Sequence, residues 1–135
     1  MGDQGYINGL ISEAEFEDGK KLSIFADALM TRENNMLLAK GLLHNEFIVK
    51  GDITQAMSFL KRIILTLSLD EYKVLLASYT NIFGKKRLTR AEICRLNIWH
   101  KKITINEIYY LKDKALKKIK QLFTDNNLEF ELKNK

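Results

Sequence analysis

The sequence predicts an all-α protein: a helical domain that carries a C-terminal helix-turn-helix and ends in a short extended tail. The chain of 135 residues contains no proline, which favours long uninterrupted helices over a turn-rich β-sandwich. Its apolar residues recur at three- and four-residue spacing through most of the second half, which is the period of an amphipathic helix. Helix-start signals precede these stretches. A chain of this length is most simply one compact unit with a real core.

The N-terminal half, residues 1–51, is predicted to be an acidic helical region. Residues 1–11 contain three glycines and one asparagine and are predicted to be a loose lead-in. Apolar side chains predict one helix from Lys20 and another that extends to about Lys50, with a break around residues 31–35. They are Leu22, Phe25, Ala26, Leu29 and Met30 in the first helix, and Leu37, Leu38, Leu42, Phe47 and Ile48 in the second. We expect this region to form a homodimer or to bind a partner; the alternative is that its helices wrap the C-terminal domain and complete its core.

The remaining residues, 52–135, are predicted to be a basic domain whose helices have clear starts. Asp52 is a good N-cap, and Ser68-x-x-Glu71 is a capping box, in which each side chain bonds the backbone N–H of the other residue. Gly84 is the expected left-handed residue after the second of these helices. The inward face of that helix is predicted to contain Tyr72, Leu75, Leu76, Tyr79 and Phe83. Residues 128–132 alternate apolar and acidic side chains, which predicts a short strand or an extended tail.

Residues 88–123 are predicted to form two further helices, a short one and then a long one. Thr89-x-x-Glu92 and Thr104-x-x-Glu107 are capping boxes. The apolar residues expected to share one face of the long helix are Ile105, Ile108, Tyr109, Ala115, Leu116, Ile119, Leu122 and Phe123. Its lysines fall mainly on the other side. A short helix, a turn and a longer basic helix make a candidate helix-turn-helix.

Basic residues are concentrated in the same region. Residues 1–60 contain five basic and nine acidic side chains, whereas residues 61–135 contain seventeen basic and eight acidic ones. Twelve of the basic residues lie between Lys85 and Gln121, against three acidic residues. Such a concentration is typical of a surface that binds nucleic acid, although a lysine-rich solvated helix face gives the same count.

Double-stranded DNA is the expected partner of this region. The candidate phosphate contacts are the basic residues on or beside the two helices and one capping threonine: Arg87, Arg90, Arg95, Lys101, Lys102, Thr104, Lys112 and Lys114. Asn106, Tyr109 and Tyr110 lie near the start of the second helix, where side chains can reach base edges in the major groove. The alternative is that Tyr109 packs in the core, Tyr110 is a surface residue and the lysines only keep the domain soluble. For Tyr109 we favour the core position.

Catalysis is not expected from this sequence. His44 and His100 are far apart and have no Cys or His at ligand spacing, and Cys94 is predicted to be a small packing residue. There is no phosphate-binding glycine loop, zinc motif or serine nucleophile motif, so no cofactor or metal is expected. No apolar run is long enough to span a bilayer, and the N-terminus lacks the pattern of a signal peptide. We therefore expect a cytoplasmic protein with no membrane partner.

From Gln55 to Phe123 the order of these motifs resembles region 4 of bacterial sigma factors. Residues 56–79 resemble the opening pair of helices of that domain, and residues 88–96, LTRAEICRL, resemble the first helix of its helix-turn-helix. The sequence KALKKI at residues 114–119 resembles the end of its recognition helix. The paired tyrosines before Lys112 are still more similar to ArpU-type phage transcriptional regulators. The resemblance implies a sigma-region-4-like helix-turn-helix in a sequence-specific regulator of phage or prophage genes.

The chain departs from this pattern at two points. The interval from Glu92 to Thr104 is longer than the tight turn of that family, so either the two helices are reoriented or the first extends through His100. The positions of the arginines that begin a sigma recognition helix are taken by Ile105, Asn106, Glu107 and Tyr109. The alternative functions are a helical adaptor for an acidic protein partner and a sigma-like factor that binds RNA polymerase.

Overall fold

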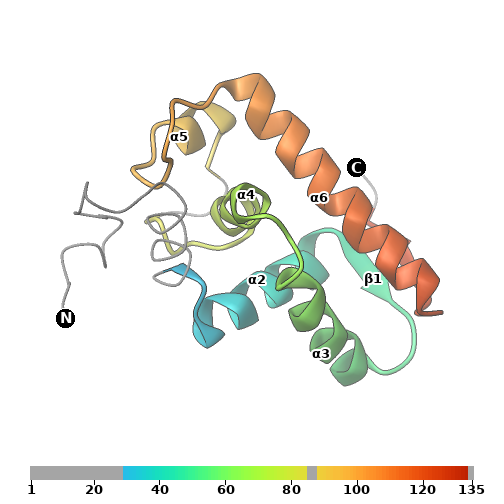
Figure 1. The fold of residues 1–135 in the computed structure, drawn as a ribbon. Helices are drawn as coiled ribbons and strands as arrows, with labels where there is room; N and C mark the ends of the chain where they lie inside the picture. Colours follow the sequence, from blue (N-terminus) through green and yellow to red (C-terminus); the bar gives the residue numbers. More distant parts are fainter. Residues whose placement is uncertain (1–28, 85–87, 134–135) are drawn as a thin grey trace.

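The computed structural model describes residues 29–84 and 88–133, and within them the chain is mainly α-helical (Figure 1). The elements are α2 (Arg32–Asn45), β1 (Phe47–Val49), α3 (Ile53–Ile64), α4 (Leu69–Tyr79), α5 (Arg90–Cys94), α6 (Ile105–Asp125) and β2 (Phe130–Leu132). The helix predicted from Lys20 lies almost entirely outside the described residues, as does Arg87. None of the described helices combines the length and apolar character needed to cross a membrane.

The helices begin at the residues that the capping signals predict. The Asp52 side chain accepts hydrogen bonds from the backbone N–H groups of Thr54 and Gln55 at the start of α3. Both hydrogen bonds of the capping box form at the starts of α4, α5 and α6. The predicted break near residues 31–35 is confirmed, because Thr31 caps α2. These local signals determine where the helices begin because each supplies partners for N–H groups that the helix itself leaves unbonded.

Helix α4 occupies the centre of the fold. It is seen nearly end-on in Figure 1, between α2, α5 and α6, with which it makes contacts. Residues 71–77 are therefore buried on every side of the helix. They include Lys73, whose ammonium group lies 5.5 Å from the centroid of the Trp99 ring. Burial lowers the pKa of Lys73 from its ordinary value to about 8, because the charged form is removed from water.

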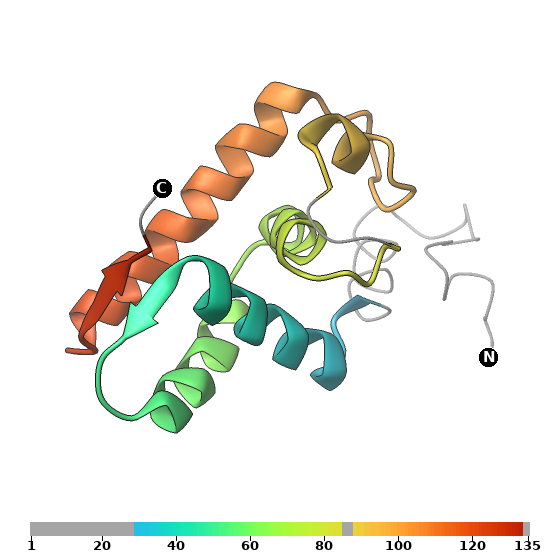
Figure 2. The same ribbon diagram turned by 180° about the vertical axis from the view of Figure 1, so that it is seen from behind.

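A small antiparallel sheet joins the two halves of the chain, with Phe47 opposite Leu132 and Val49 opposite Phe130. The strand or extended tail predicted for residues 128–132 is confirmed as β2. The helix predicted to include Phe47 and Ile48 is wrong, because α2 ends at Asn45 and these residues form β1. Figure 2 shows both strands beside the C-terminal half of α6. Strand β1 is hydrogen-bonded to β2, which is distant in the sequence. The local apolar pattern around residues 47–49 therefore could not predict a strand there.

One hydrophobic core includes residues on both sides of position 51. Leu38, Leu42 and Phe47 are buried in the same cluster as Leu60 and Leu75 of α3 and α4. The cluster also contains Ile119 of α6, which is fully buried, whereas Leu116 is only partly buried against it. Within the described residues, the segment before position 51 therefore completes the core of the segment that follows.

Two glycines have defined structural roles. Gly84 was expected to end α4, but α4 ends at Tyr79 with Thr80 as an extended C-cap. Gly84 instead closes a separate turn at φ 105°, donating its N–H to the Asn81 carbonyl. Gly41 lies where α2 crosses the end of α4. A Cβ atom at that position would lie 2.2 Å from the backbone oxygen of Tyr79.

Replacing Gly41 by alanine should therefore lower the free energy of unfolding by about 1–3 kcal/mol, the usual cost of overpacking a close contact. Helix propensity alone predicts the opposite sign, since alanine is favoured over glycine by about 1 kcal/mol inside a helix. Urea denaturation monitored by circular dichroism measures the difference. Lys40→Ala, a change at the exposed preceding position of α2, is the control and should leave stability almost unchanged. A Gly41→Ala protein as stable as the wild type would show that α2 and α4 do not approach so closely.

Candidate nucleic-acid interface

The short helix α5 and the long helix α6 pack together over a small second core. Its buried residues are Val74, Ala77, Ile93, Ile103 and Ile108, from α4, α5, α6 and the loop before α6. Helix α5 ends at Cys94 and does not extend through His100. Cys94 is partly buried against this core, as predicted. The chain between α5 and α6 is therefore a true loop, and it contributes to the packing.

That loop is held in place by apolar side chains that point inward. Ile98 and Ile103 are buried, and the indole N–H of Trp99 donates to the Ile93 carbonyl at 2.9 Å. The Ile93 carbonyl lies in the last turn of α5, so this hydrogen bond ties the loop back to the helix that precedes it. Our sequence interpretation assigned no role to Trp99. The signal that could have found it is a set of large apolar residues in an otherwise polar interhelical segment.

The beginning of α6 is fixed by Thr104 and Glu107. The Thr104 hydroxyl accepts from the Glu107 N–H at 3.1 Å, and the Glu107 carboxylate accepts from the Thr104 N–H at 2.8 Å. The same carboxylate lies 3.3 Å from the ammonium group of Lys101. The hydrogen bond from Thr104 and the positive charge of Lys101 both lower the pKa of Glu107. Lys101, a predicted phosphate contact, is thus an exposed residue with an acidic partner.

The outward face of the first turns of α6 contains Asn106, Tyr109, Tyr110 and Lys114, all of which are exposed. The core position favoured for Tyr109 is wrong, since 51% of this residue is accessible to solvent. Ile105, which was expected on the same apolar face, is also exposed. The helix directs Ile108 and Ala115 into the core, and Tyr109 is turned by about 100° from Ile108, as one residue of an α-helix requires.

Cations from α5 and α6 lie over the two tyrosine rings. The guanidinium carbon of Arg90 is 3.5 Å from the centroid of the Tyr109 ring, and the ammonium nitrogen of Lys114 is 5.6 Å from that of Tyr110. Both separations are within the range of cation–π attraction. We call these four residues and Asn106 the α5–α6 surface; its five members are Arg90, Asn106, Tyr109, Tyr110 and Lys114. It is an exposed, basic and aromatic surface built by two helices.

The other residues predicted to contact DNA lie outside the α5–α6 surface or at its edge. Lys112 is partly buried, and its ammonium group lies 5.2 Å from the Tyr79 ring centroid, on a different side of α6. Arg95 is the exposed C-cap of α5, and Lys102 is exposed in the loop. Asp113 is an exposed acidic residue of α6, and it forms an ion pair with Lys117 at 3.1 Å.

No protein-family model matches the chain, and no curated protein or solved structure shows significant similarity to it. The chemistry of the α5–α6 surface is therefore what indicates a function.

Proposed function

We propose that the protein is a transcriptional regulator that binds double-stranded DNA through a helix-turn-helix formed by α5 and α6. The observation that supports this proposal best is the composition of the α5–α6 surface. Its centre offers an amide and two tyrosines, and basic groups flank it from both helices. The sequence resemblance to ArpU-type regulators adds phage or prophage genes as the proposed targets.

In this proposal the first turns of α6 enter the major groove. A side-chain amide such as that of Asn106 can make two hydrogen bonds with the edge of an adenine, and an aromatic ring can contact a thymine methyl group. Helix α5 would cross the DNA backbone, which is the usual place of the first helix of such a motif. Arg90 and Arg95 at its two ends would then contact phosphates.

The contact between Arg90 and Tyr109 prepares the surface for binding. An arginine side chain loses conformational freedom when it binds a phosphate, and stacking on a ring restricts that freedom in advance. The guanidinium keeps its charge and its hydrogen-bond donors while it lies on the ring. Arg90 would therefore bind a phosphate at a lower entropic cost than the lysines of the loop.

The first experiment measures how DNA affinity depends on salt. Binding of the full-length protein to a labelled duplex should weaken steeply as salt rises, by about 0.9 log units per phosphate contact for each log unit of salt. The double variant Arg90→Ala/Lys114→Ala should bind less tightly. Its slope of log affinity against log salt should be smaller by about the value expected for two phosphate contacts. Lys50→Ala is the matched control, because Lys50 is exposed and lies beside the small sheet in an ion pair with Glu131. If the double variant has the same slope as the wild type, the α5–α6 surface is not part of the DNA interface.

The second experiment asks whether α6 reads bases. Duplexes selected from a random pool by the wild-type protein should bind Asn106→Ala more weakly by about 1–3 kcal/mol, the usual value of a bidentate base contact. Affinity for unselected DNA should stay unchanged, because Asn106 carries no charge. Equal losses on selected and unselected duplexes would contradict base recognition by Asn106.

An adaptor for an acidic protein is the second candidate function. Tyrosine and arginine are enriched at protein interfaces, and both are exposed on the α5–α6 surface. The selection experiment separates the two functions, because an acidic protein partner imposes no preference for a DNA sequence. Failure to enrich any duplex, together with weak binding to all DNA at low salt, would favour the adaptor. A sigma-like factor would in addition bind RNA polymerase in the absence of DNA.

A further inference from the structure

A groove with a volume of about 870 Å³ lies between α2, the end of α4, the α5 segment and α6. We call it the α2–α6 groove and define it by six of its residues: Lys40, His44, Glu46, Tyr79, Arg90 and Lys112. Its volume is within the range of cavities that bind small organic molecules. Three separate helices and one helix end form its walls, so it is concave and does not resemble a flat protein-binding face.

Positive charge dominates the polar part of the lining. Lys40 comes from α2, Arg90 from α5 and Lys112 from α6, and the His44 side chain of α2 lies in the same lining. Among the residues that line the groove, Glu46 is the carboxylate, and it accepts a hydrogen bond from the Tyr79 hydroxyl. That hydrogen bond occupies part of the capacity of Glu46 to bind a cation. The groove is therefore suited to a negatively charged occupant.

The rest of the lining is uncharged, and it includes apolar side chains, one glycine and the polar side chains of Asn45, Ser78, Thr80, Asn81 and Thr89. Leu37 of α2 is exposed and Leu88, just before α5, is partly buried, and both supply hydrocarbon surface to the groove, whereas Ile93 and Ile108 form its buried floor. Gly41 lies in the wall that α2 contributes, and no larger residue fits there because of the Tyr79 carbonyl. A mixture of hydrocarbon wall and a few convergent charged groups is typical of sites for small organic ligands. It fits a ligand with a carbon skeleton better than it fits a bare inorganic ion.

We propose that the α2–α6 groove binds a small organic polyanion that carries carboxylate or phosphate groups. Lys40, Lys112 and Arg90 bind its charged groups from three directions, and the apolar wall contacts its carbon skeleton. An acidic peptide offers the same charges, but it needs an extended track, whereas this groove is enclosed by four elements of one small domain.

The groove and the α5–α6 surface share Arg90 and α6. Arg90 lines the groove while its guanidinium lies on the Tyr109 ring, so a ligand that attracts Arg90 competes with that contact. Lys112 of α6 lines the groove, and Tyr109 and Tyr110 of the same helix face outward. A bound polyanion should therefore weaken DNA binding. This regulatory consequence rests on the proposed function, but the binding site itself does not.

The site is tested by nuclear magnetic resonance with the ¹⁵N-labelled full-length protein and citrate at constant ionic strength. The backbone amides of Gly41, His44 and Asn81, all in the groove lining, should shift along saturable curves. Lys40→Gln/Lys112→Gln should weaken citrate binding by about tenfold or more, as expected when two charged contacts are lost. Lys50→Gln/Lys117→Gln removes two exposed lysines away from the groove and should bind citrate as the wild type does.

Three results would overturn the proposal. Shifts that never saturate, or equal weakening by both double variants, would mean general attraction to a basic protein. If a hexaglutamate peptide shifts the same amides at a lower concentration than citrate, the natural occupant of the groove is an acidic peptide and not a small ligand.

Duplex binding with and without saturating citrate then tests the regulation, for which we expect citrate to lower the DNA affinity by about threefold or more. Unchanged DNA affinity with an occupied groove would contradict the coupling through Arg90, and failure of all DNA binding would contradict the proposed function alone.

Discussion

Replacing Phe123 by alanine should lower the free energy of unfolding by about 3–5 kcal/mol, the usual cost of truncating a buried phenylalanine. Phe123 is fully buried near the end of α6, where its ring meets three others. The centroids of Phe47 and Phe130 are each 5.3 Å away in edge-on arrangements, and Phe59 stacks at 6.1 Å. The cluster joins α6 to α3 and to both strands, so one truncation weakens four elements together.

Thermal and urea denaturation of the full-length protein measure this loss. Phe130→Ala is the matched control, because its ring belongs to the same cluster but is only half-buried at the end of the chain. It should cost clearly less than Phe123→Ala. Phe123→Leu should recover part of the stability, because it restores most of the lost volume. A loss below about 1 kcal/mol for Phe123→Ala would mean that the end of α6 is not packed against the sheet.

The sequence predicted the starts of the helices well because N-capping is local chemistry. Ser68, Thr89 and Thr104 each form the expected capping box within four residues, so no distant information is needed. Strand β1 was missed for the opposite reason. Its partner β2 lies at the other end of the chain, and the burial of Phe47 depends on rings that follow it by many residues.

The α5–α6 surface was predicted in part. Charge and helix position correctly suggested Arg90, Asn106, Tyr110 and Lys114 as exposed residues. The predicted core position of Tyr109 was wrong, because the sequence alone does not determine which way α6 is rotated about its axis. An aromatic residue next to Ile108 fits the apolar face equally well until the packing of the helix is known. The groove could not be predicted, since its lining comes from four segments that only the tertiary fold brings together.

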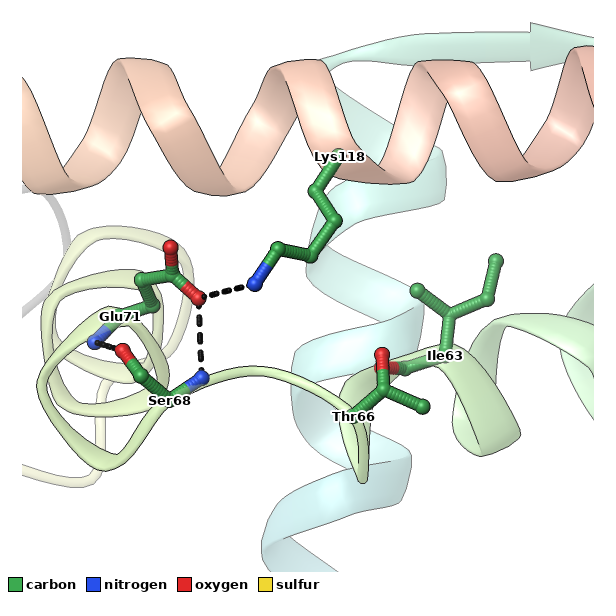
Figure 3. A network of polar contacts seen from close by, with 5 residues as sticks. All are labelled: Ile63, Thr66, Ser68, Glu71 and Lys118. Carbon is green, nitrogen blue, oxygen red and sulfur yellow. Dashed lines mark hydrogen bonds and ion pairs between the residues drawn. The ribbon is translucent and has the colours of Figure 1, made fainter.

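The three capping boxes are alike in sequence but differ in their surroundings. At the start of α4 the Glu71 side chain is fully buried, whereas the Glu107 side chain at the start of α6 is 41% exposed. Figure 3 shows the ammonium group of Lys118 reaching from α6 to the Glu71 carboxylate, and the two lie 2.9 Å apart. Glu71 also accepts from the Ser68 N–H at 2.9 Å. This carboxylate therefore connects two helices as well as capping one.

Replacing Glu71 by alanine should consequently cost about 2–4 kcal/mol, the sum of a lost cap and a lost charge-assisted hydrogen bond in a buried site. The Lys118 side chain is 36% exposed and can turn toward water, which keeps the loss below that of breaking a fully buried pair. Glu92→Ala and Glu107→Ala are the matched controls, and each should cost only about 1 kcal/mol. Equal losses in all three variants would show that the contact between Glu71 and Lys118 contributes nothing.

The pH dependence of stability tests the same contact independently. Burial alone would raise the pKa of Glu71, but the hydrogen bond from Ser68 and the charge of Lys118 outweigh it, so the pKa lies below its ordinary value of 4.5. A carboxyl group whose pKa is lowered by folding stabilises the protein above 4.5, and this contribution is lost as the pH falls through the folded-state value. Glu71→Gln keeps an oxygen for the Ser68 N–H and removes the charge. The difference in unfolding free energy between the wild type and Glu71→Gln should therefore be constant near neutral pH and should shrink below about pH 4.5. A difference that does not change with pH would mean that the variant acts by altered packing and not by the lost ion pair.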